Sequence, residues 1–273
     1  MKNKDLLSIK EFSEFSGIPA STLRYYDDSG LFHPALRGEN GYRYYSPQQL
    51  TTLNFVHVLS NLKVSLKTIK EAQRSRTPES IAMLLSRQEQ LLDTQIRLAQ
   101  DAHAVIHTFL RLLNEGMNAR EDEIYVAEEP AMSFVLGDVN DFRDDDYFYA
   151  TFARFCASAD RLRINLNYPV GGYFQDMAAY QAQPSRPTRF FSADPFGRES
   201  KPAGKYLVGF VRGYYGNTGD LPRRMKEYAE EHGLVFSGAV YNLFLQDEIS
   251  VRDPDQYLQK VSAGLQFGRG GCV

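Results

Sequence analysis

The sequence has no tryptophan, only two cysteines among its 273 residues, and no apolar run long enough to cross a membrane. Cys156 and Cys272 are too few and too widely spaced for a disulfide framework or a zinc site. The opening residues, MKNKDLLSIKEF, lack the apolar core of a signal peptide. We therefore expect a cytoplasmic protein that does not contact a membrane and carries no cofactor. Its two cysteines should be reduced thiols.

The composition indicates a folded protein with an uneven distribution of charge. Hydrophobic residues make up 43% of the chain and aromatic residues 13%, which excludes a disordered chain. At this length, two compact units and a connector are expected. Residues 1–76 hold 11 Lys and Arg against 7 Asp and Glu, whereas the remainder holds 20 against 27. A basic head on an acidic body favours nucleic-acid contact near the N-terminus.

The first 30 residues contain signals for two short helices. Ser8 and Glu11 have the spacing of a capping box, and Gly17 follows the apolar face of the helix that they begin. A second helix carries residues 21–26 and ends before Gly30. Two short helices joined by a glycine-containing turn predict a helix-turn-helix.

The next segment predicts a wing and two further helices. Residues 31–45 are rich in glycine, proline and paired aromatics, which is typical of a two-stranded wing with its tip at 37–41. Ser46, followed by Pro47 and Gln49, predicts the start of a third helix that runs to about Leu59. A fourth helix is expected over 66–74, capped by Ser65.

Such a unit can place a helix in the major groove and basic side chains on the phosphates. Arg24 could donate hydrogen bonds to a phosphate or a guanine edge. We expect Tyr26 and Tyr44 to fill the local core and Tyr25 and Tyr42 to face DNA. The residues expected to contact DNA are Ser21, Thr22, Arg24, Tyr25, Arg37, Tyr42, Arg43, Lys63 and Lys67.

The order of three motifs in this region resembles the MerR family of transcription activators. These motifs are Thr22-Leu23-Arg24-Tyr25-Tyr26-Asp27, Gly30-Leu31-Phe32 and Gly41-Tyr42-Arg43-Tyr44-Tyr45, and the likeness extends over residues 8–75. It implies a homodimer on double-stranded promoter DNA in which the spacer between the two recognition elements for RNA polymerase, the promoter boxes, is overlong. Such regulators bend and untwist the DNA so that the polymerase can use both boxes.

A long helix is expected between Thr77 and Gly116, because the stretch after Pro78 contains no glycine or proline. Its apolar residues repeat every seven positions, which predicts a coiled coil. We expect this stripe to form the dimer and a neighbouring stripe, from Leu85 to Leu113, to contact another domain; an intramolecular bundle is the alternative. The family resemblance implies an antiparallel helix pair. The expected dimer residues are Leu84, Gln88, Leu91, Gln95, Leu98, Val105, Phe109 and Leu112.

The C-terminal half contains an internal pseudo-repeat of strand–helix–strand–strand. The first copy is expected at residues 132–136, 146–159, 168–174 and 188–192, and the second at 205–212, 221–232, 238–246 and 256–263. The predicted fold class is α+β, and the seam between two such halves is a common ligand site. The expected domains are a DNA-binding unit at 1–76, a dimerisation helix at 77–116 and an effector domain at 121–273.

Three segments of this half resemble the GyrI-like effector domain of multidrug-sensing (BmrR-like) MerR regulators: residues 202–206, residues 230–234, and Val240 with Tyr241. The resemblance implies a pocket for bulky, often cationic, aromatic compounds. It also implies carboxylates on the last two strands, where this sequence has Asn242 and Lys260. A buried cation without a counter-charge is destabilised, so neutral or amphiphilic ligands become plausible. Asp145, Asp146, Asp247 and Glu248 could supply charge instead.

Aromatic density supports a hydrophobic or cationic small-molecule ligand, because tyrosine offers both a flat apolar face and a hydroxyl. Ligand binding would then activate transcription. The alternative is that the GyrI-like domain acts as a hydrolase or a passive sequestering module, although no catalytic constellation is evident. His103 and His107 lack a third metal ligand, so no metal site is expected. The expected ligand residues are Phe148, Tyr149, Tyr168, Tyr173, Tyr214, Tyr241 and Phe244.

Overall fold

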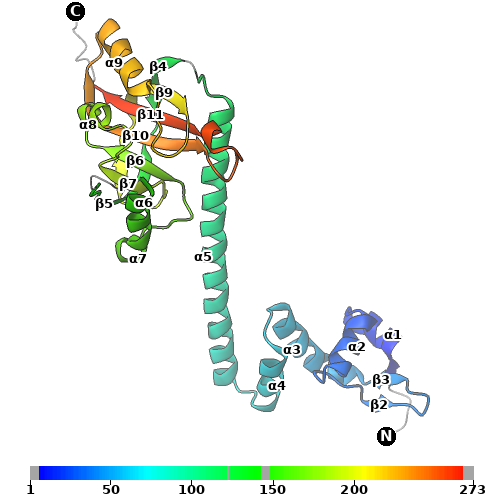
Figure 1. The fold of residues 1–273 in the computed structure, drawn as a ribbon. Helices are drawn as coiled ribbons and strands as arrows, with labels where there is room; N and C mark the ends of the chain where they lie inside the picture. Colours follow the sequence, from blue (N-terminus) through cyan, green and yellow to red (C-terminus); the bar gives the residue numbers. More distant parts are fainter. Residues whose placement is uncertain (1–5, 122, 143–147, 267–273) are drawn as a thin grey trace, which may run out of the picture. The chain divides into compact units, whose positions relative to one another are not determined.

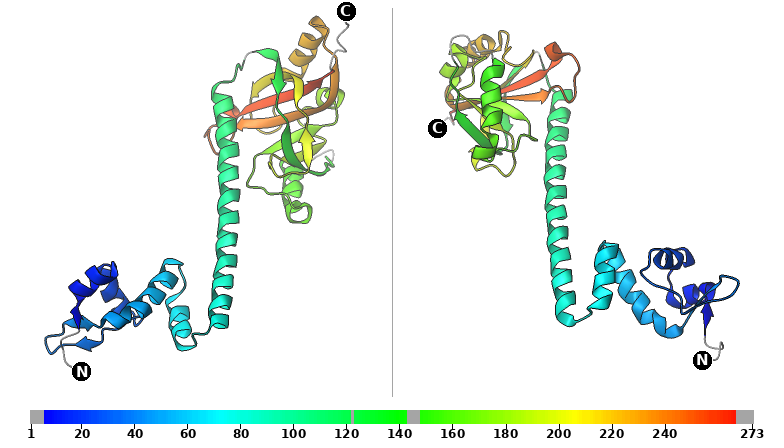
Figure 2. Two further views of the ribbon diagram at one scale, coloured as in Figure 1. Left: turned by 180° about the vertical axis from the view of Figure 1, so that it is seen from behind. Right: turned by 60° about the horizontal axis from the view of Figure 1, so that its bottom comes forward.

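A computed structural model describes residues 6–121, 123–142 and 148–266 of the chain (Figure 1). The chain divides into two compact units, Met1–Leu98 and Ala99–Val273. Helix α5 (Pro78–Met117) begins in the first unit and ends in the second, and Figure 2 shows it as one uninterrupted helix. Asp145, Asp146 and Cys272, which were considered above, lie outside the described residues.

The N-terminal unit is a winged helix-turn-helix followed by two further helices and the start of α5. A three-stranded sheet has the order β1-β3-β2, with all pairs antiparallel. The elements in chain order are β1 (Leu7–Ser8), α1 (Ile9–Ser16), α2 (Ala20–Asp28), β2 (Leu36–Arg37), β3 (Arg43–Tyr45), the 3₁₀ turn η2 (Pro47–Gln49), α3 (Leu50–Asn61) and α4 (Leu66–Arg74).

The expected helix caps of this unit are confirmed. Ser8 and Glu11 form a capping box at the start of α1, and Gly17 ends the helix in the left-handed conformation with φ 71°. The Ser46–Gln49 capping box begins a 3₁₀ turn rather than an α-helix. Ser65 accepts a hydrogen bond from the Thr68 backbone N–H at 3.2 Å, which caps α4.

An aromatic stack forms the centre of the N-terminal core. The ring of Tyr45 lies almost parallel to those of Phe12 and Phe32, with centroids 4.8 and 5.6 Å away. The assignment of Tyr44 to this core was wrong: Tyr44 is only half-buried, and Tyr45 is fully buried. Because side chains alternate along β3, only one of the two adjacent tyrosines can face inward.

The C-terminal unit is an antiparallel sheet with helices on one face. Its elements are β4 (Ile124–Glu129), β5 (Met132–Val139), α6 (Phe148–Ala157), α7 (Ala159–Leu162), β6 (Val170–Phe174), α8 (Met177–Ala182), β7 (Arg189–Ser192), β8 (Glu199–Lys201), β9 (Gly204–Arg212), α9 (Leu221–Glu231), β10 (Phe236–Gln246), the 3₁₀ turn η3 (Pro254–Gln256) and β11 (Leu258–Leu265). The strand order is β4-β9-β11-β10-β6-β7-β5-β8.

The pseudo-repeat is visible in this order. Strands β5, β6 and β7 with α6 form one half, and β9, β10 and β11 with α9 form the other. The halves meet where β10 pairs with β6, and Tyr241 lies opposite Tyr173. Three elements were not predicted from the sequence: β4 and β8, which extend the two sheet edges, and α8, which interrupts the first half.

The two faces of the sheet carry separate cores. On the helical face, α9 and α8 pack over one cluster that includes Val240 and Val261, and α6 packs over a second that includes Phe190. On the other face, Phe191, Tyr241 and neighbouring residues pack against Leu112 of α5. Strand β10 therefore contributes alternate residues to the two sides.

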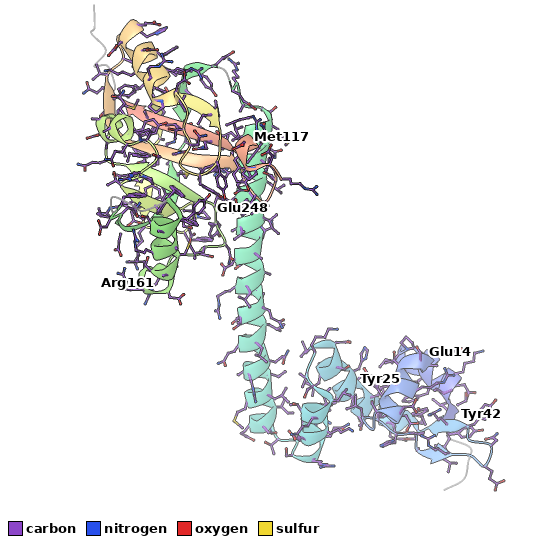
Figure 3. All side chains as sticks on the ribbon, viewed as in Figure 1. Glu14, Tyr25, Tyr42, Met117, Arg161 and Glu248 are labelled. Carbon is purple, nitrogen blue, oxygen red and sulfur yellow. The ribbon has the colours of Figure 1, made fainter. Side chains whose placement is uncertain are left out.

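The last three turns of α5 pack closely on that second face. Thr108, Leu112 and Gly116 are buried, although the earlier part of the helix has exposed apolar side chains. A Cβ atom at Gly116 would lie 3.2 Å from side-chain atoms of Gln246 and Leu245, so this glycine permits the close approach. Figure 3 labels Met117 at this end of α5, near Glu248 in the loop after β10.

Among the described residues, no helix has both the length and the apolar character needed to span a bilayer.

Candidate functional site

One side of α2 has the exposed polar side chains that a nucleic-acid interface requires. The helix is anchored by Leu23 and Tyr26, which are buried. Arg24 and Tyr25 lie on its exposed side, and 52% of Tyr25 is accessible. Tyr42 on the wing is 63% accessible, and Figure 3 shows both tyrosines on the surface of this unit.

Asp27 links α2 to the wing. Its carboxylate is only 3% exposed and accepts hydrogen bonds from Arg37 Nη2 and Arg43 Nε, both at 2.5 Å. His33 Nδ1 lies 2.9 Å away, and Arg43 also donates to Asp28 at 2.8 Å. Burial favours the neutral acid, but hydrogen bonds and charge from these partners outweigh it and hold the pKa of Asp27 below its usual value.

This network gives the two wing arginines a structural role that the sequence analysis did not foresee. Arg43 is mostly covered, whereas Arg37 remains about half exposed. Lys63 and Lys67 lie exposed at the turn before α4 and in its first turn, with Lys63 in the left-handed conformation at φ 62°. Ser21 is exposed and Thr22 half-buried at the start of α2.

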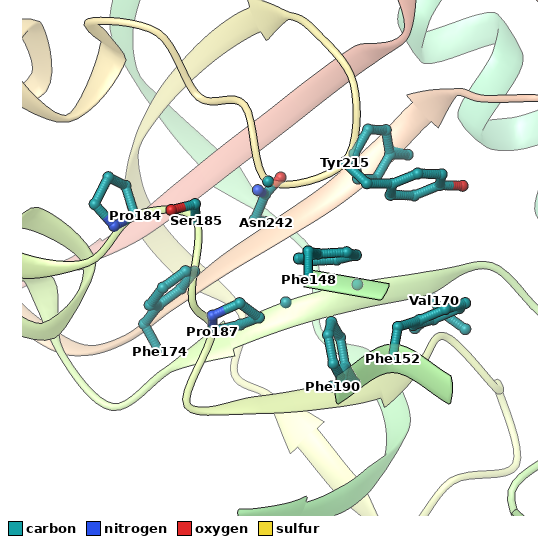
Figure 4. A pocket seen from close by; sticks show the side chains of 14 residues that line it. Phe148, Phe152, Val170, Phe174, Pro184, Ser185, Pro187, Phe190, Tyr215 and Asn242 are labelled. Atoms are coloured by element: carbon teal, nitrogen blue, oxygen red, sulfur yellow. The ribbon is translucent and has the colours of Figure 1, made fainter. Parts of the chain in front are cut away.

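A second candidate site is an aromatic cavity on the helical face of the C-terminal sheet. It encloses about 30 Å³, enough for about one water molecule. Phe148 and Phe152 of α6 and Phe190 of β7 form one wall, and Pro184, Pro187 and Phe174 form another (Figure 4). Its other lining residues are Val170, Gly171, Gly172, Ser185, Tyr215, Gly216, Asn242 and Phe244.

The buried side-chain amide of Asn242 lines this cavity. Its Nδ2 donates to Gln259 Oε1 at 3.0 Å, and Gln259 Nε2 donates to the backbone oxygens of Gly213 and Asn217 at 3.0 and 2.7 Å. The Oδ1 atom of Asn242 is buried and accepts no hydrogen bond from any residue that the structure describes. A buried acceptor without a partner is rare and costly in a folded protein.

The opposite face of the same strands holds a charged cluster against α5. Lys260 of β11 pairs with Glu115 of α5 and Glu129 of β4, and Lys201 of β8 also donates to Glu129. Burial lowers the pKa of Lys201. In Lys260 the two carboxylates outweigh burial and raise the pKa. The cluster borders a cavity of about 260 Å³ that Tyr241 also lines.

Several predicted ligand residues are therefore separated. Phe148 and Phe244 line the aromatic cavity, and Tyr149 and Tyr214 lie together outside its lining, with centroids 5.6 Å apart. Tyr241 and Tyr173 belong to the α5-side core, and Tyr168 is 2% exposed and lines neither cavity. These seven residues therefore do not line a single cavity, and their role in ligand binding stays a prediction.

The two substituted positions named from the family resemblance, Asn242 and Lys260, lie on opposite faces of the sheet. Lys260 lies opposite Leu243 on β10, so it points to the α5 side, whereas Asn242 points to the helical side. The polar residue of β11 that contacts Asn242 is Gln259, which the sequence analysis missed.

The predicted dimer stripe of α5 is only partly available to a partner. Leu112 is 2% exposed, Leu84 packs on the N-terminal core, and Gln88 Nε2 donates to the Leu62 backbone oxygen at 2.7 Å. These three residues therefore make intramolecular contacts that the predicted dimer stripe did not include. Leu91, Gln95 and Leu98 are exposed, and Val105 and Phe109 are half-buried.

The neighbouring stripe, expected to contact another domain, is instead largely exposed. Leu85, Leu92 and Ile106 are 41%, 36% and 59% accessible, and Ile96 and Leu110 lie exposed on the same side of the helix. His103 and His107 stack with centroids 6.5 Å apart. The described residues include no group of three or more His, Cys, Asp or Glu placed to hold a metal ion.

Comparison with known proteins places the chain in a family. Residues 7–76 match the MerR HTH family of regulatory proteins. The chain is 27% identical over 256 residues to the multidrug-efflux transporter 2 regulator of Bacillus subtilis (strain 168), covering 91% of this chain and 92% of that protein. It is 31% identical over 100 residues to the HTH-type transcriptional regulator HmrR of Sinorhizobium medicae (strain WSM419), covering 35% of this chain and 68% of that protein.

Among solved structures, the EcmrR–DNA complex in EcmrR-RPo covers 96% of this chain and 100% of its own, with 17% identity and a TM-score of 0.39. A helix-turn-helix with a short wing defines the N-terminal unit as a DNA-binding unit. The chain belongs to the MerR family and is a DNA-binding transcription regulator. The family match ends at residue 76, so the GyrI-like character of the second unit stays an expectation.

Asp27→Asn should weaken specific DNA binding although the side chain is buried. The change removes the charge that positions Arg37 and Arg43, and hydrogen bonds to charged groups contribute about 1.5–3 kcal/mol. We expect about tenfold weaker binding to a promoter duplex selected by the protein from a random pool, with non-specific binding unchanged. Fluorescence anisotropy measures both affinities.

Asp28→Asn is the matched control, because Asp28 is exposed and its pair with Arg43 should contribute little. Equal affinities for the Asp27→Asn and Asp28→Asn variants would show that the buried carboxylate does not organise the interface.

Proposed function

We propose that the chain is a dimeric regulator that binds and distorts promoter DNA and activates transcription when an aromatic small molecule occupies its C-terminal unit. The DNA-binding unit would comprise residues 1–76, the dimerisation helix 77–116 and the effector domain 121–273. The observation that carries the proposal is the position of β10, which contacts the aromatic cavity through Asn242 and Phe244 and the α5-side core through Tyr241 and Leu243.

The DNA contacts are proposed from exposure and charge. Arg24 and Tyr25 on α2 face solvent together with Ser21, and Tyr42 projects from the wing. Arg37 keeps half of its surface free for a phosphate while Asp27 fixes its position. Lys63 and Lys67 add a second cationic contact. With two copies on one duplex, these contacts could offset the elastic cost of deforming the promoter for RNA polymerase.

The dimer is proposed from the exposed apolar face of α5. Leu91 and Leu98 are 53% and 64% accessible, and the parallel row of Leu92, Ile96 and Ile106 is also exposed. An apolar surface that extends along several helical turns is typical of a helix–helix interface. A second copy of α5 would cover both rows, with Gln95 as a polar layer between them.

The coupling is proposed from the ion pairs between α5 and the sheet. Lys260 contacts Glu115 on the helix, and the neighbouring residue Gln259 bonds Asn242 at the aromatic cavity. A ligand that shifts β10 or β11 would therefore alter how α5 packs against the sheet. Allosteric coupling of this kind requires two states in which each ligand makes different contacts.

The regulator should bind its promoter in both states but activate transcription in only one. A ligand is first identified by screening cationic and neutral aromatic compounds for those that raise the midpoint of thermal unfolding of the protein. With that ligand, we expect in-vitro transcription from a promoter with an overlong spacer to rise at least about fivefold, while promoter affinity changes less than transcription does. Equal transcription with and without bound ligand would contradict the allosteric part of the proposal.

Glu115→Gln should reduce induction without abolishing either binding event. The change removes the α5 partner of Lys260 but leaves Glu129 to neutralise that ammonium. We expect ligand and promoter affinities within about twofold of the wild type and at least about a fivefold loss of ligand-dependent transcription. Titration calorimetry, anisotropy and in-vitro transcription provide the three measurements.

Glu123→Gln is the control, because it removes a carboxylate from an exposed pair with Arg120. Wild-type induction in the Glu115→Gln variant would exclude this ion pair as the coupling element.

A further inference from the structure

We infer that the aromatic cavity takes an uncharged aromatic molecule that donates one N–H or O–H hydrogen bond to Asn242 Oδ1. The inference rests on the proposed function, because it names the ligand class of the same unit. It starts from a buried acceptor that has no donor among the described residues. A ligand that supplies the donor would complete the hydrogen bonding of this site.

The hydrogen-bond network fixes the orientation of the Asn242 side-chain amide. The backbone oxygens of Gly213 and Asn217 can only accept, so the Gln259 group that contacts both must be its NH₂. The Gln259 oxygen therefore faces Asn242 and must receive that residue's NH₂. Asn242 Oδ1 is the atom left over, and rotating the amide would break the bond to Gln259.

The described residues that line the cavity provide no charged side chain for a cationic ligand. None of its 14 lining residues is an Asp, Glu, Lys, Arg or His. The nearby carboxylate of Glu248 lies outside the lining and accepts a hydrogen bond from the Tyr215 hydroxyl at 2.5 Å. A cation placed beside Asn242 would lose its hydration without gaining a counter-ion from these lining residues, which is unfavourable. An uncharged ring system avoids that cost.

The shape of the site favours a flat ligand. The Phe148 ring stands edge-on to Phe190, with centroids 5.3 Å apart, and is stacked on Tyr215 at 5.9 Å. Gly172 lies beside Asn242 on the same face, and a Cβ atom there would approach Pro187 to 3.0 Å. Because the enclosed volume is only about 30 Å³, a ligand must displace one or more of these rings. An aromatic ring would replace the ring contacts that are lost.

Three probes of similar size separate the possible ligand classes on the full-length protein. 2-Naphthol has a hydroxyl donor, 2-methoxynaphthalene lacks the donor, and 1-methylquinolinium carries a fixed positive charge. We expect 2-naphthol to bind at least about tenfold more tightly than either of the others by titration calorimetry, because a buried acceptor is left unpaired without a donor.

The Asn242→Leu variant removes the acceptor and should reduce the preference for 2-naphthol over 2-methoxynaphthalene to less than about twofold. Asn167→Leu makes the same chemical change at an exposed loop position and should retain the preference. If loss of the Asn242 bond to Gln259 prevents folding of the first variant, the comparison of the three probes on the wild type still decides the inference.

Equal affinities for the two naphthalenes, tightest binding of 1-methylquinolinium, or no binding of any probe would each overturn the inference. These outcomes differ from failure of the proposed function. If the quinolinium binds tightly and activates transcription, the ligand class is wrong but the regulator is ligand-responsive. If bound ligands of every class leave transcription unchanged, the proposed function itself fails.

Discussion

The alternation of side chains along a β-strand is the constraint on which the C-terminal unit depends. In β10, Asn242 and Phe244 point to the aromatic cavity, and Tyr241 and Leu243 point to the core that holds α5. The side chains of β11 alternate in the same way: Gln259 points to the side of the aromatic cavity, and Lys260 points to the side of α5. One pair of strands therefore borders both the aromatic cavity and the long helix, with no intervening loop.

The N-terminal unit uses a buried charge to organise an exposed surface. Asp27 cannot reach DNA itself, yet it fixes two wing arginines against the end of α2. Desolvating this carboxylate is costly, and three basic neighbours offset that cost. Both units thus contain a buried polar group whose partners position a surface or a cavity. In the proposed mechanism, α5 connects them.

The local structure of the chain was predictable because its signals are local. The capping residues Ser8 and Ser65, the glycine at position 17 and the heptad spacing of α5 each act within a few turns. The candidate sites depend on contacts between distant residues, and there the predictions failed. Leu112 and Leu98 occupy equivalent heptad positions, but only Leu112 lies against a sheet. Lys260 was named and Gln259 overlooked because the register of β11 with β10, which decides the residues that lie near Asn242, is not encoded within either strand.

The central claim is that one pair of strands relays ligand occupancy from the aromatic cavity to α5. Hydrogen–deuterium exchange of the full-length protein, with and without saturating 2-naphthol, tests it directly. The account predicts that occupancy changes amide protection both in β10, residues 236–246, and in the last turns of α5, residues 108–116. Changes confined to β10 and α6, with protection of α5 unaltered, would contradict it.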